Sequence, residues 1–153
     1  MDLVKQFREY TRRLECHLGN MKKADCCCCG VSEAQCFLLV EIGRNPGVSV
    51  KELADILHID KSGVSRSVEE LVQKGFVERK TSREDRRFVT LSLLPEGQER
   101  FEKIEHDMYF KFREVLERIP SDKREQVIEA LKLYNEACLA VEDISNDQRN
   151  EQK

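Results

Sequence analysis

The stretch SVKELADILHIDKSGVSRSVEELVQKGFVERKTSREDRRFVTLSLLPEG, residues 49–97, decides the fold. Ser49 and Glu52 have the spacing of a capping box, and the apolar residues that follow recur at helical spacing. After a short interruption, Asp60 is placed to cap a second amphipathic helix, which Gly75 ends. Two short helices joined by a tight turn predict a helix-turn-helix.

The second half of this stretch changes from helical to strand-like spacing. FVERK (76–80) and FVTLSL (88–93) alternate apolar and polar residues, and both are rich in β-branched and aromatic side chains. TSREDRR (81–87) between them is polar and turn-prone, while LPEG (94–97) ends the second strand. The pattern predicts a β-hairpin with a charged tip.

Amphipathic helices are predicted on both sides of the quoted stretch. One begins near Leu3 and ends near Gly19, and a buried helix follows a capping box over residues 32–35. A long helix is predicted over residues 101–119, and a last helix over 127–141 after a break at Pro120.

These elements predict one domain of 153 residues that is mainly α with a small β-hairpin wing. A winged helix-turn-helix core is expected at 32–97, between N-terminal (1–31) and C-terminal (98–145) dimerisation helices. Residues 146–153 are expected to be a frayed tail. The apolar stripes of the flanking helices exceed what a small core can cover, which favours a homodimer.

The quoted stretch resembles the winged-helix core of MarR-type transcription regulators, and with its flanking helices the likeness covers nearly the whole chain. Asp85, Arg86 and Arg87 match the family's Asp-x-Arg wing motif. The resemblance implies a homodimer that binds double-stranded DNA, with Arg87 as the arginine that enters the minor groove. Two recognition helices about 34 Å apart would read a near-palindromic operator.

The charge distribution agrees with a DNA-binding role for residues 61–90. The net charge of the chain is −3, but this segment carries +3 and the remainder carries −6. A charge run of this kind is usually only a solvated turn, so the argument depends on the helix-turn-helix that precedes it.

Particular DNA contacts follow from the apolar pattern of the second helix. If Val64, Val68 and Leu71 face inward, four residues point outward toward base edges and phosphates. These are Lys61, Ser62, Ser65 and Arg66. In the wing, Asp85 is expected to brace Arg87 through a bidentate pair. The expected phosphate contacts are Lys80, Arg83 and Arg86, whereas Lys74 and Arg79 are interpreted as general surface charge.

The segment ADCCCCG (24–30) places four consecutive cysteines between the first two predicted helices. The chain has seven cysteines, no secretory signal and no long apolar run, so we expect a cytoplasmic protein, outside the membrane, with reduced thiols. In an extended connection, Cys26 with Cys28 or Cys27 with Cys29 can reach one ion. Further candidate ligands are Cys36 and Cys16, and with less support His17 and His106. In MarR-like dimers this connection lies close to the dimer seam and the usual effector pocket.

Thiolates suit soft or borderline ions, and the sequence therefore predicts a regulator controlled by a metal or metalloid. Arsenite, As(III), is the first expectation and Zn(II) the second, with Cu(I) also compatible; none is required for the fold. Cysteine oxidation is the alternative trigger, and a metal-buffering protein without DNA binding is the alternative of another class. Since no catalytic triad order, phosphate-binding glycine loop or paired carboxylate site is evident, the chain is not expected to be an enzyme.

Overall fold

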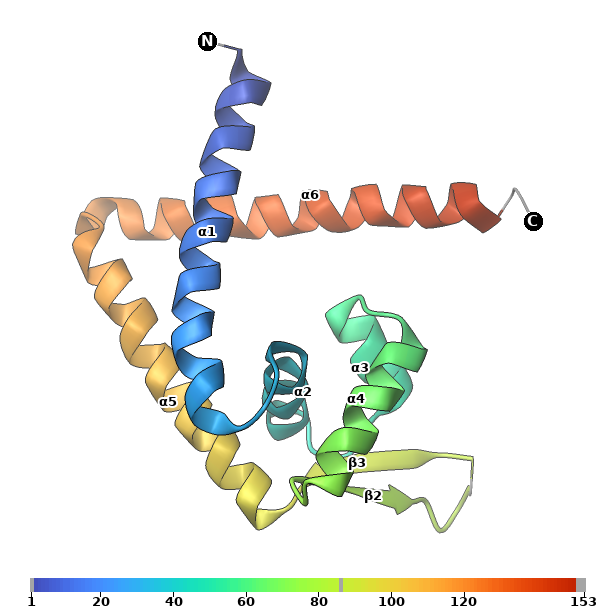
Figure 1. Ribbon diagram of the computed structural model, residues 1–153. Coiled ribbons are helices and arrows are strands. Elements are labelled where there is room, and N and C mark those ends of the chain that lie inside the picture. The colour runs from blue at the N-terminus through green and yellow to red at the C-terminus, as the bar shows by residue number, and fades with distance from the viewer. Residues whose placement is uncertain (1, 86, 151–153) are drawn as a thin grey trace. The chain divides into compact units, whose positions relative to one another are not determined.

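The computed structural model describes residues 2–85 and 87–150, with side chains at all of these positions except 23–29 and 143–150 (Figure 1). The chain forms two compact units, residues 1–107 and 108–153, and helix α5 spans the boundary between them. The elements in chain order are α1 (Leu3–Cys29), α2 (Glu33–Arg44), β1 (Val48–Ser49), α3 (Val50–Leu57), α4 (Lys61–Gln73), β2 (Val77–Thr81), β3 (Val89–Leu93), α5 (Pro95–Arg118), the 3-10 helix η1 (Ser121–Lys123) and α6 (Arg124–Asn150). This mainly helical architecture with a small antiparallel sheet confirms the predicted fold class.

Helices α3 and α4 form the predicted helix-turn-helix. The Ser49 hydroxyl accepts a hydrogen bond from the backbone N–H of Glu52, and the Glu52 carboxylate accepts one from the backbone N–H of Ser49, at 3.1 and 2.7 Å. This is the predicted capping box. His58 ends α3 in the left-handed conformation, with φ of 51°. Because the turn contains only three residues, 58–60, α4 begins at once in a new direction.

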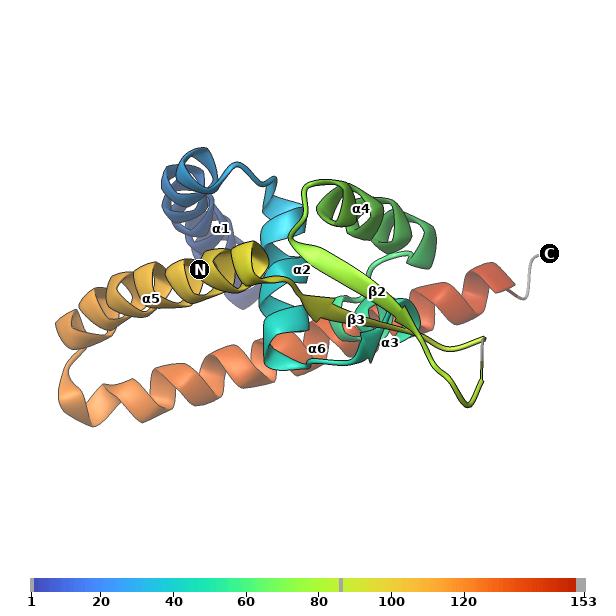
Figure 2. The same ribbon diagram turned by 90° about the horizontal axis from the view of Figure 1, so that it is seen from below.

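The wing is a three-stranded antiparallel sheet in the order β1, β3, β2. Strands β2 and β3 pair from Val77 opposite Leu93 to Thr81 opposite Val89, which confirms the predicted hairpin. The two-residue strand β1 was not predicted, and it pairs with β3 through Val48 opposite Leu91. Figures 1 and 2 show β2 beside α4 and the β2–β3 loop projecting beyond the sheet.

The core of the first unit lies between the helix-turn-helix, α2 and the sheet. Its fully buried side chains come from every layer, and they are Leu39, Ile42, Leu53, Val64, Val68, Leu71, Val77 and Leu91. Each such side chain contributes about 1.5–3 kcal/mol through removal of apolar surface from water. Three of the eight belong to α4, so the core fixes the rotation of this helix about its own axis.

Helix α1 is longer than predicted, because it continues past Gly19 to Cys29. A glycine in a helix interior costs only about 1 kcal/mol relative to alanine, and the surroundings of Gly19 are open. The helix ends where Gly30 adopts a left-handed φ of 67°. The expectation of an extended connection containing the cysteines was therefore wrong. The pairings of Cys26 with Cys28 and of Cys27 with Cys29 were predicted for such a connection, and the side chains concerned lie outside the described residues.

The second unit contains the predicted break at Pro120 and a long final helix. Arg124 bridges the break, since its guanidinium donates to the backbone carbonyls of Ile119 and Glu117 at 3.1 and 3.2 Å. Helix α6 then continues to Asn150, so residues 146–150 are helical where a frayed tail was predicted. Residues 151–153 of that tail lie outside the described residues.

Along the described parts of the chain, none of the helices has the length and apolar character needed to cross a membrane.

Large apolar side chains are exposed along the flanking helices of each unit. On α1 they are Leu3, Val4, Phe7, Tyr10 and Leu14, with Leu3 78% exposed. In the second unit they include Tyr109, Phe112 and Val115 on α5, and Ile128, Leu131, Leu133 and Val141 on α6. Since large exposed apolar patches mark interaction sites in folded proteins, these helices are candidates for an interface.

Substitution by alanine is expected to have opposite effects on the free energy of unfolding at two glycines, Gly97 and Gly19. A Cβ at Gly97 would overlap the backbone carbonyl of Phe76, which is already fixed by a 2.9 Å hydrogen bond from the N–H of Leu94. We expect Gly97→Ala to lower the free energy of unfolding by about 2 kcal/mol or more through overpacking. Gly19→Ala fills open space in α1 and should raise it by about 0.5–1 kcal/mol.

Urea unfolding followed by circular dichroism measures both changes, with the wild-type chain as the reference. Equal stability of Gly97→Ala and the wild type would show that the first turn of α5 does not lie against the Phe76 backbone as described.

Candidate nucleic-acid interface

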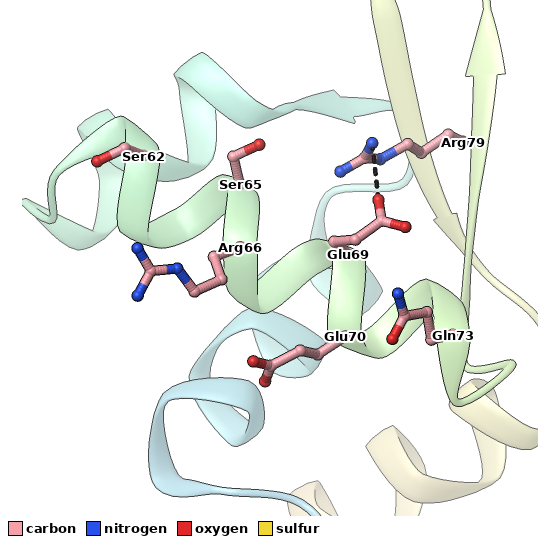
Figure 3. A pocket seen from close by; sticks show the side chains of 7 residues that line it. All are labelled: Ser62, Ser65, Arg66, Glu69, Glu70, Gln73 and Arg79. Carbon is pink, nitrogen blue, oxygen red and sulfur yellow. Dashed lines mark ion pairs between the residues drawn. The ribbon is translucent and has the colours of Figure 1, made fainter.

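The outward face of α4 carries the residues that the sequence predicted as DNA contacts. Val64, Val68 and Leu71 are at most 2% exposed, and their burial turns the opposite face toward solvent. Lys61, Ser62 and Arg66 are exposed on that face, and Ser65 is half-buried. Figure 3 shows Ser62, Ser65 and Arg66 around a hollow on α4 that Glu69, Gln73 and Arg79 also line.

The beginning of α4 is fixed by its cap. The Asp60 carboxylate accepts hydrogen bonds from the Ser62 hydroxyl and from the backbone N–H of Gly63, the latter at 3.2 Å. These two bonds lower the pKa of the Asp60 carboxyl below its ordinary value of 3.8, and the bond from Ser62 has the larger effect. Because the Ser62 hydroxyl donates its hydrogen bond to Asp60, only its lone pairs remain available, and these accept hydrogen bonds.

The far end of α4 is tied to α2 by a polar cluster around Gln35. Gln35 is 3% exposed, and its amide donates to the Glu70 carboxylate at 2.6 Å. Its amide oxygen accepts from the Lys74 ammonium at 2.8 Å, and Lys74 also donates to the carbonyl of Gly30 at 3.1 Å. Lys74 is exposed, as its interpretation as surface charge implies, and its ammonium also links three segments.

The wing tip holds Arg87 beside Asp85. One Asp85 oxygen, Oδ1, accepts from the backbone N–H of Arg87 at 2.9 Å and from its Nε at 3.3 Å. The bracing contact that the sequence predicted is present, but it uses one carboxylate oxygen and not a bidentate pair. The Arg87 side chain is 90% exposed, so its guanidinium extends into solvent from a fixed base. Arg86 lies outside the described residues.

The remaining cations near α4 differ in their surroundings. Lys80 forms an ion pair of 2.7 Å with Glu78 on its own strand, and Arg83 is exposed in the wing loop. Arg79 was interpreted as general surface charge, but its guanidinium lies 3.1 Å from the Glu69 carboxylate of α4 (Figure 3). The sequence gives no local signal for this pair, because its members are brought together only when β2 packs beside α4.

The candidate thiol site is only partly visible. Cys26, Cys27, Cys28 and Cys29 lie in the last turns of α1, but their side chains are outside the described residues. Cys16 and His17 are exposed on α1, His106 is exposed on α5, and Cys36 is half-buried in the first turn of α2. Among the side chains that the structure describes, no three Cys, His, Asp or Glu residues are grouped to hold a metal ion. The predicted ion site therefore stays a prediction.

Comparison with known proteins gives one consistent result. The model of the MarR family matches residues 30–87. The HTH-type transcriptional regulator BilQ of Clostridium symbiosum (strain WAL-14163) is 33% identical over 104 residues, which cover 67% of this chain and 72% of the relative. The HTH-type transcriptional repressor MdtR of Bacillus subtilis (strain 168) is 33% identical over 75 residues, which cover 49% and 48%.

The fold is also found among solved structures. The crystal structure of Streptococcus pneumoniae FabT in complex with DNA superimposes with a TM-score of 0.80, covering 90% of this chain and 99% of that chain. The MarR protein from Peptoclostridium difficile gives a TM-score of 0.76 and covers 86% of each chain. The identities are 17% and 18%, so this likeness establishes the fold alone.

The Asp60 cap predicts a pH-dependent contribution to stability. Because the folded-state pKa lies below the ordinary value of 3.8, the carboxylate stabilises the folded chain above that pH, and the contribution is lost as pH falls through the folded pKa. We expect Asp60→Ala to lower the thermal midpoint at about pH 7, with a much smaller deficit relative to wild type at about pH 2. Circular dichroism at both pH values measures this.

Asp60→Asn is the matched control, since Asn caps a helix without a titrating charge. Its midpoint at neutral pH should stay near the wild type. A deficit for Asp60→Ala that is equally large at both pH values would show that the ionised cap does not stabilise α4.

Proposed function

This chain belongs to the MarR family of transcription regulators, and we propose that it is a homodimeric repressor that binds a near-palindromic DNA operator. In this proposal, the N-terminal half of α4 enters the major groove and Arg87 enters the adjacent minor groove. Lys61, Ser62, Ser65 and Arg66 contact base edges and nearby phosphates. The wing cations, including Lys80 and Arg83, contact the DNA backbone.

One observation carries the DNA-binding proposal: α4 presents a capped, solvent-exposed polar face while the wing beside it holds a braced and 90% exposed arginine. The cap of α4 and the contact of Asp85 with Arg87 are both present without DNA, which would reduce the conformational entropy lost on binding. The positive charge of residues 61–90 would favour approach to the negatively charged duplex.

The homodimer is supported by the exposed apolar side chains on α1, and independently by those on α5 and α6. A second copy of the chain would remove such surface from water, which is the main driving force for obligate association. Two-fold symmetry would place the two α4 helices about 34 Å apart, one turn of DNA. The repressor role is suggested by the repressor MdtR, to which the chain is similar.

The identity of the effector is proposed from the cysteine segment of the sequence. We propose that Cys26–Cys29 bind a thiophilic ion, arsenite first or Zn(II) second, and that binding changes the affinity for DNA. The position of these residues supports a coupling, since Gly30 directly follows α1, and its carbonyl accepts a hydrogen bond from Lys74, the residue that follows α4. A coupling of about 1–3 kcal/mol changes affinity about 5- to 150-fold.

Binding to DNA tests the proposed function directly. Duplexes selected from a random library should contain two inverted half-sites about one helical turn apart, and fluorescence anisotropy at several salt concentrations gives their affinity. Arg66→Ala and Arg87→Ala should each weaken binding by at least about fivefold, since loss of one good contact costs about 1–3 kcal/mol. Arg118→Ala, at the exposed end of α5, is the matched control and should bind as the wild type.

Failure of the wild-type chain to select any sequence, or affinity independent of salt, would contradict the DNA-binding proposal.

The thiol proposal has its own test. Arsenite, Zn(II), Cu(I) and peroxide are each added to the reduced protein bound to its selected duplex. We expect arsenite to change the affinity by at least about fivefold, and replacement of Cys26–Cys29 by Ser to abolish this change while leaving DNA binding intact. Cys138→Ser on α6 is the control for a thiol elsewhere.

A response to peroxide alone would instead identify cysteine oxidation as the trigger. Tight metal binding without salt-dependent DNA binding would identify a metal-buffering protein. An unchanged metal response in the variant without Cys26–Cys29 would contradict the thiol site.

A further inference from the structure

Glu69 places a negative charge on the face of α4 that is proposed to meet DNA. It follows Ser65 by four residues and Arg66 by three, so one helical turn separates it from both. Its side chain is 49% exposed and lines the same hollow as Ser62 and Ser65 (Figure 3). A carboxylate without a partner at this position would be repelled by the phosphates that border a DNA groove.

Arg79 supplies the compensating charge. Its Nη1 lies 3.1 Å from Oε2 of Glu69, and Figure 3 shows the two side chains pointing toward each other from β2 and α4. The Arg66 side chain lines the same hollow but extends away from Arg79 in the view of Figure 3. Because the guanidinium has five N–H donors and the carboxylate has two oxygens, both members of the pair keep hydrogen-bonding capacity beyond their mutual contact.

The chemistry of a carboxylate restricts which base it can read. It only accepts hydrogen bonds, and cytosine presents its N4 amino group as a donor in the major groove. Guanine presents two acceptors there, which would repel the carboxylate. Adenine presents an acceptor, N7, beside its amino group, which also disfavours a carboxylate. Among these three bases, cytosine fits Glu69 best.

We propose that Glu69 is a specificity-determining residue, which accepts a hydrogen bond from the N4 amino group of one cytosine in each half-site. Arg79 offsets the charge of Glu69 and contacts a neighbouring phosphate. The inference rests on the proposed DNA-binding function, and it adds two residues, on α4 and β2, to the set expected from the sequence.

The test compares duplexes selected from one random library by the wild-type chain, Glu69→Gln and Glu69→Asp. We expect a cytosine at one position of each half-site for the wild type. Glu69→Gln should reduce this preference about tenfold and favour adenine there, because Gln pairs with N6 and N7 of adenine. Glu69→Asp keeps the carboxylate, so it should bind more weakly but still prefer cytosine. Glu99→Gln removes one negative charge at an exposed position of α5, and it is the matched control for the loss of charge.

Arg79→Gln tests the second member of the pair. It should weaken binding to all duplexes alike, without a change in base preference, and lower the slope of log K against log salt by about one. Thermal midpoints of all variants establish that each is folded at the assay temperature.

If Glu69→Gln selected the same DNA sequence as the wild-type chain, the inference would be overturned, because Glu69 would then serve only as a counter-ion for Arg79. A change of base preference in Arg79→Gln would also overturn it. Failure of the wild type to select any sequence is a different result, which contradicts the proposed DNA-binding function itself.

Discussion

The burial of Val64, Val68 and Leu71 against the core is the constraint on which the function of this chain depends. These three side chains, at most 2% exposed, occupy one side of α4 and set its rotation about its axis. The outward direction of Ser62 and Arg66 then follows from helical geometry and needs no interaction of their own. Hydrophobic packing has no directional preference by itself. On a helix, however, the spacing of the apolar residues decides which face is buried, and the opposite face is then left polar and exposed.

Short hydrogen-bonded contacts refine this arrangement at both ends of α4 and at the wing. Asp60 fixes the first turn, and the buried amide of Gln35 joins the last turn to α2 through Glu70 and Lys74. At the wing, Asp85 holds the backbone and the side chain of Arg87 with one oxygen. Each exposed contact is weak, but together they keep the polar groups in place before any partner binds.

Much of the fold was predictable because its signals are local. The capping boxes at Ser32 and Ser49 and the cap at Asp60 each involve residues within three positions, and all three are present. The hairpin itself followed from the alternation of apolar and polar residues, although its register was not predicted. Strand β1 has two residues and exists only because the edge of β3 is available, so the sequence could not show it.

The candidate site was less predictable, since several of its contacts join distant segments. The Glu69–Arg79 ion pair joins α4 to a strand, and the Gln35 cluster joins residues up to 44 positions apart. The length of helix α1 was underestimated because Gly19 resembles a stop signal, although the free-energy cost of one glycine is too small to end a long helix. The role of the four cysteines depends on side chains that lie outside the described residues.

The most direct test is the structure of the chain bound to a DNA duplex that it selects, because this structure shows where α4 and the wing contact the DNA. The account predicts that the outward face of α4, from Lys61 to Arg66, lies in the major groove, with Arg87 in the minor groove next to it. A complex in which that face remains in solvent, or in which helix and wing do not contact adjacent grooves of one duplex, would contradict it.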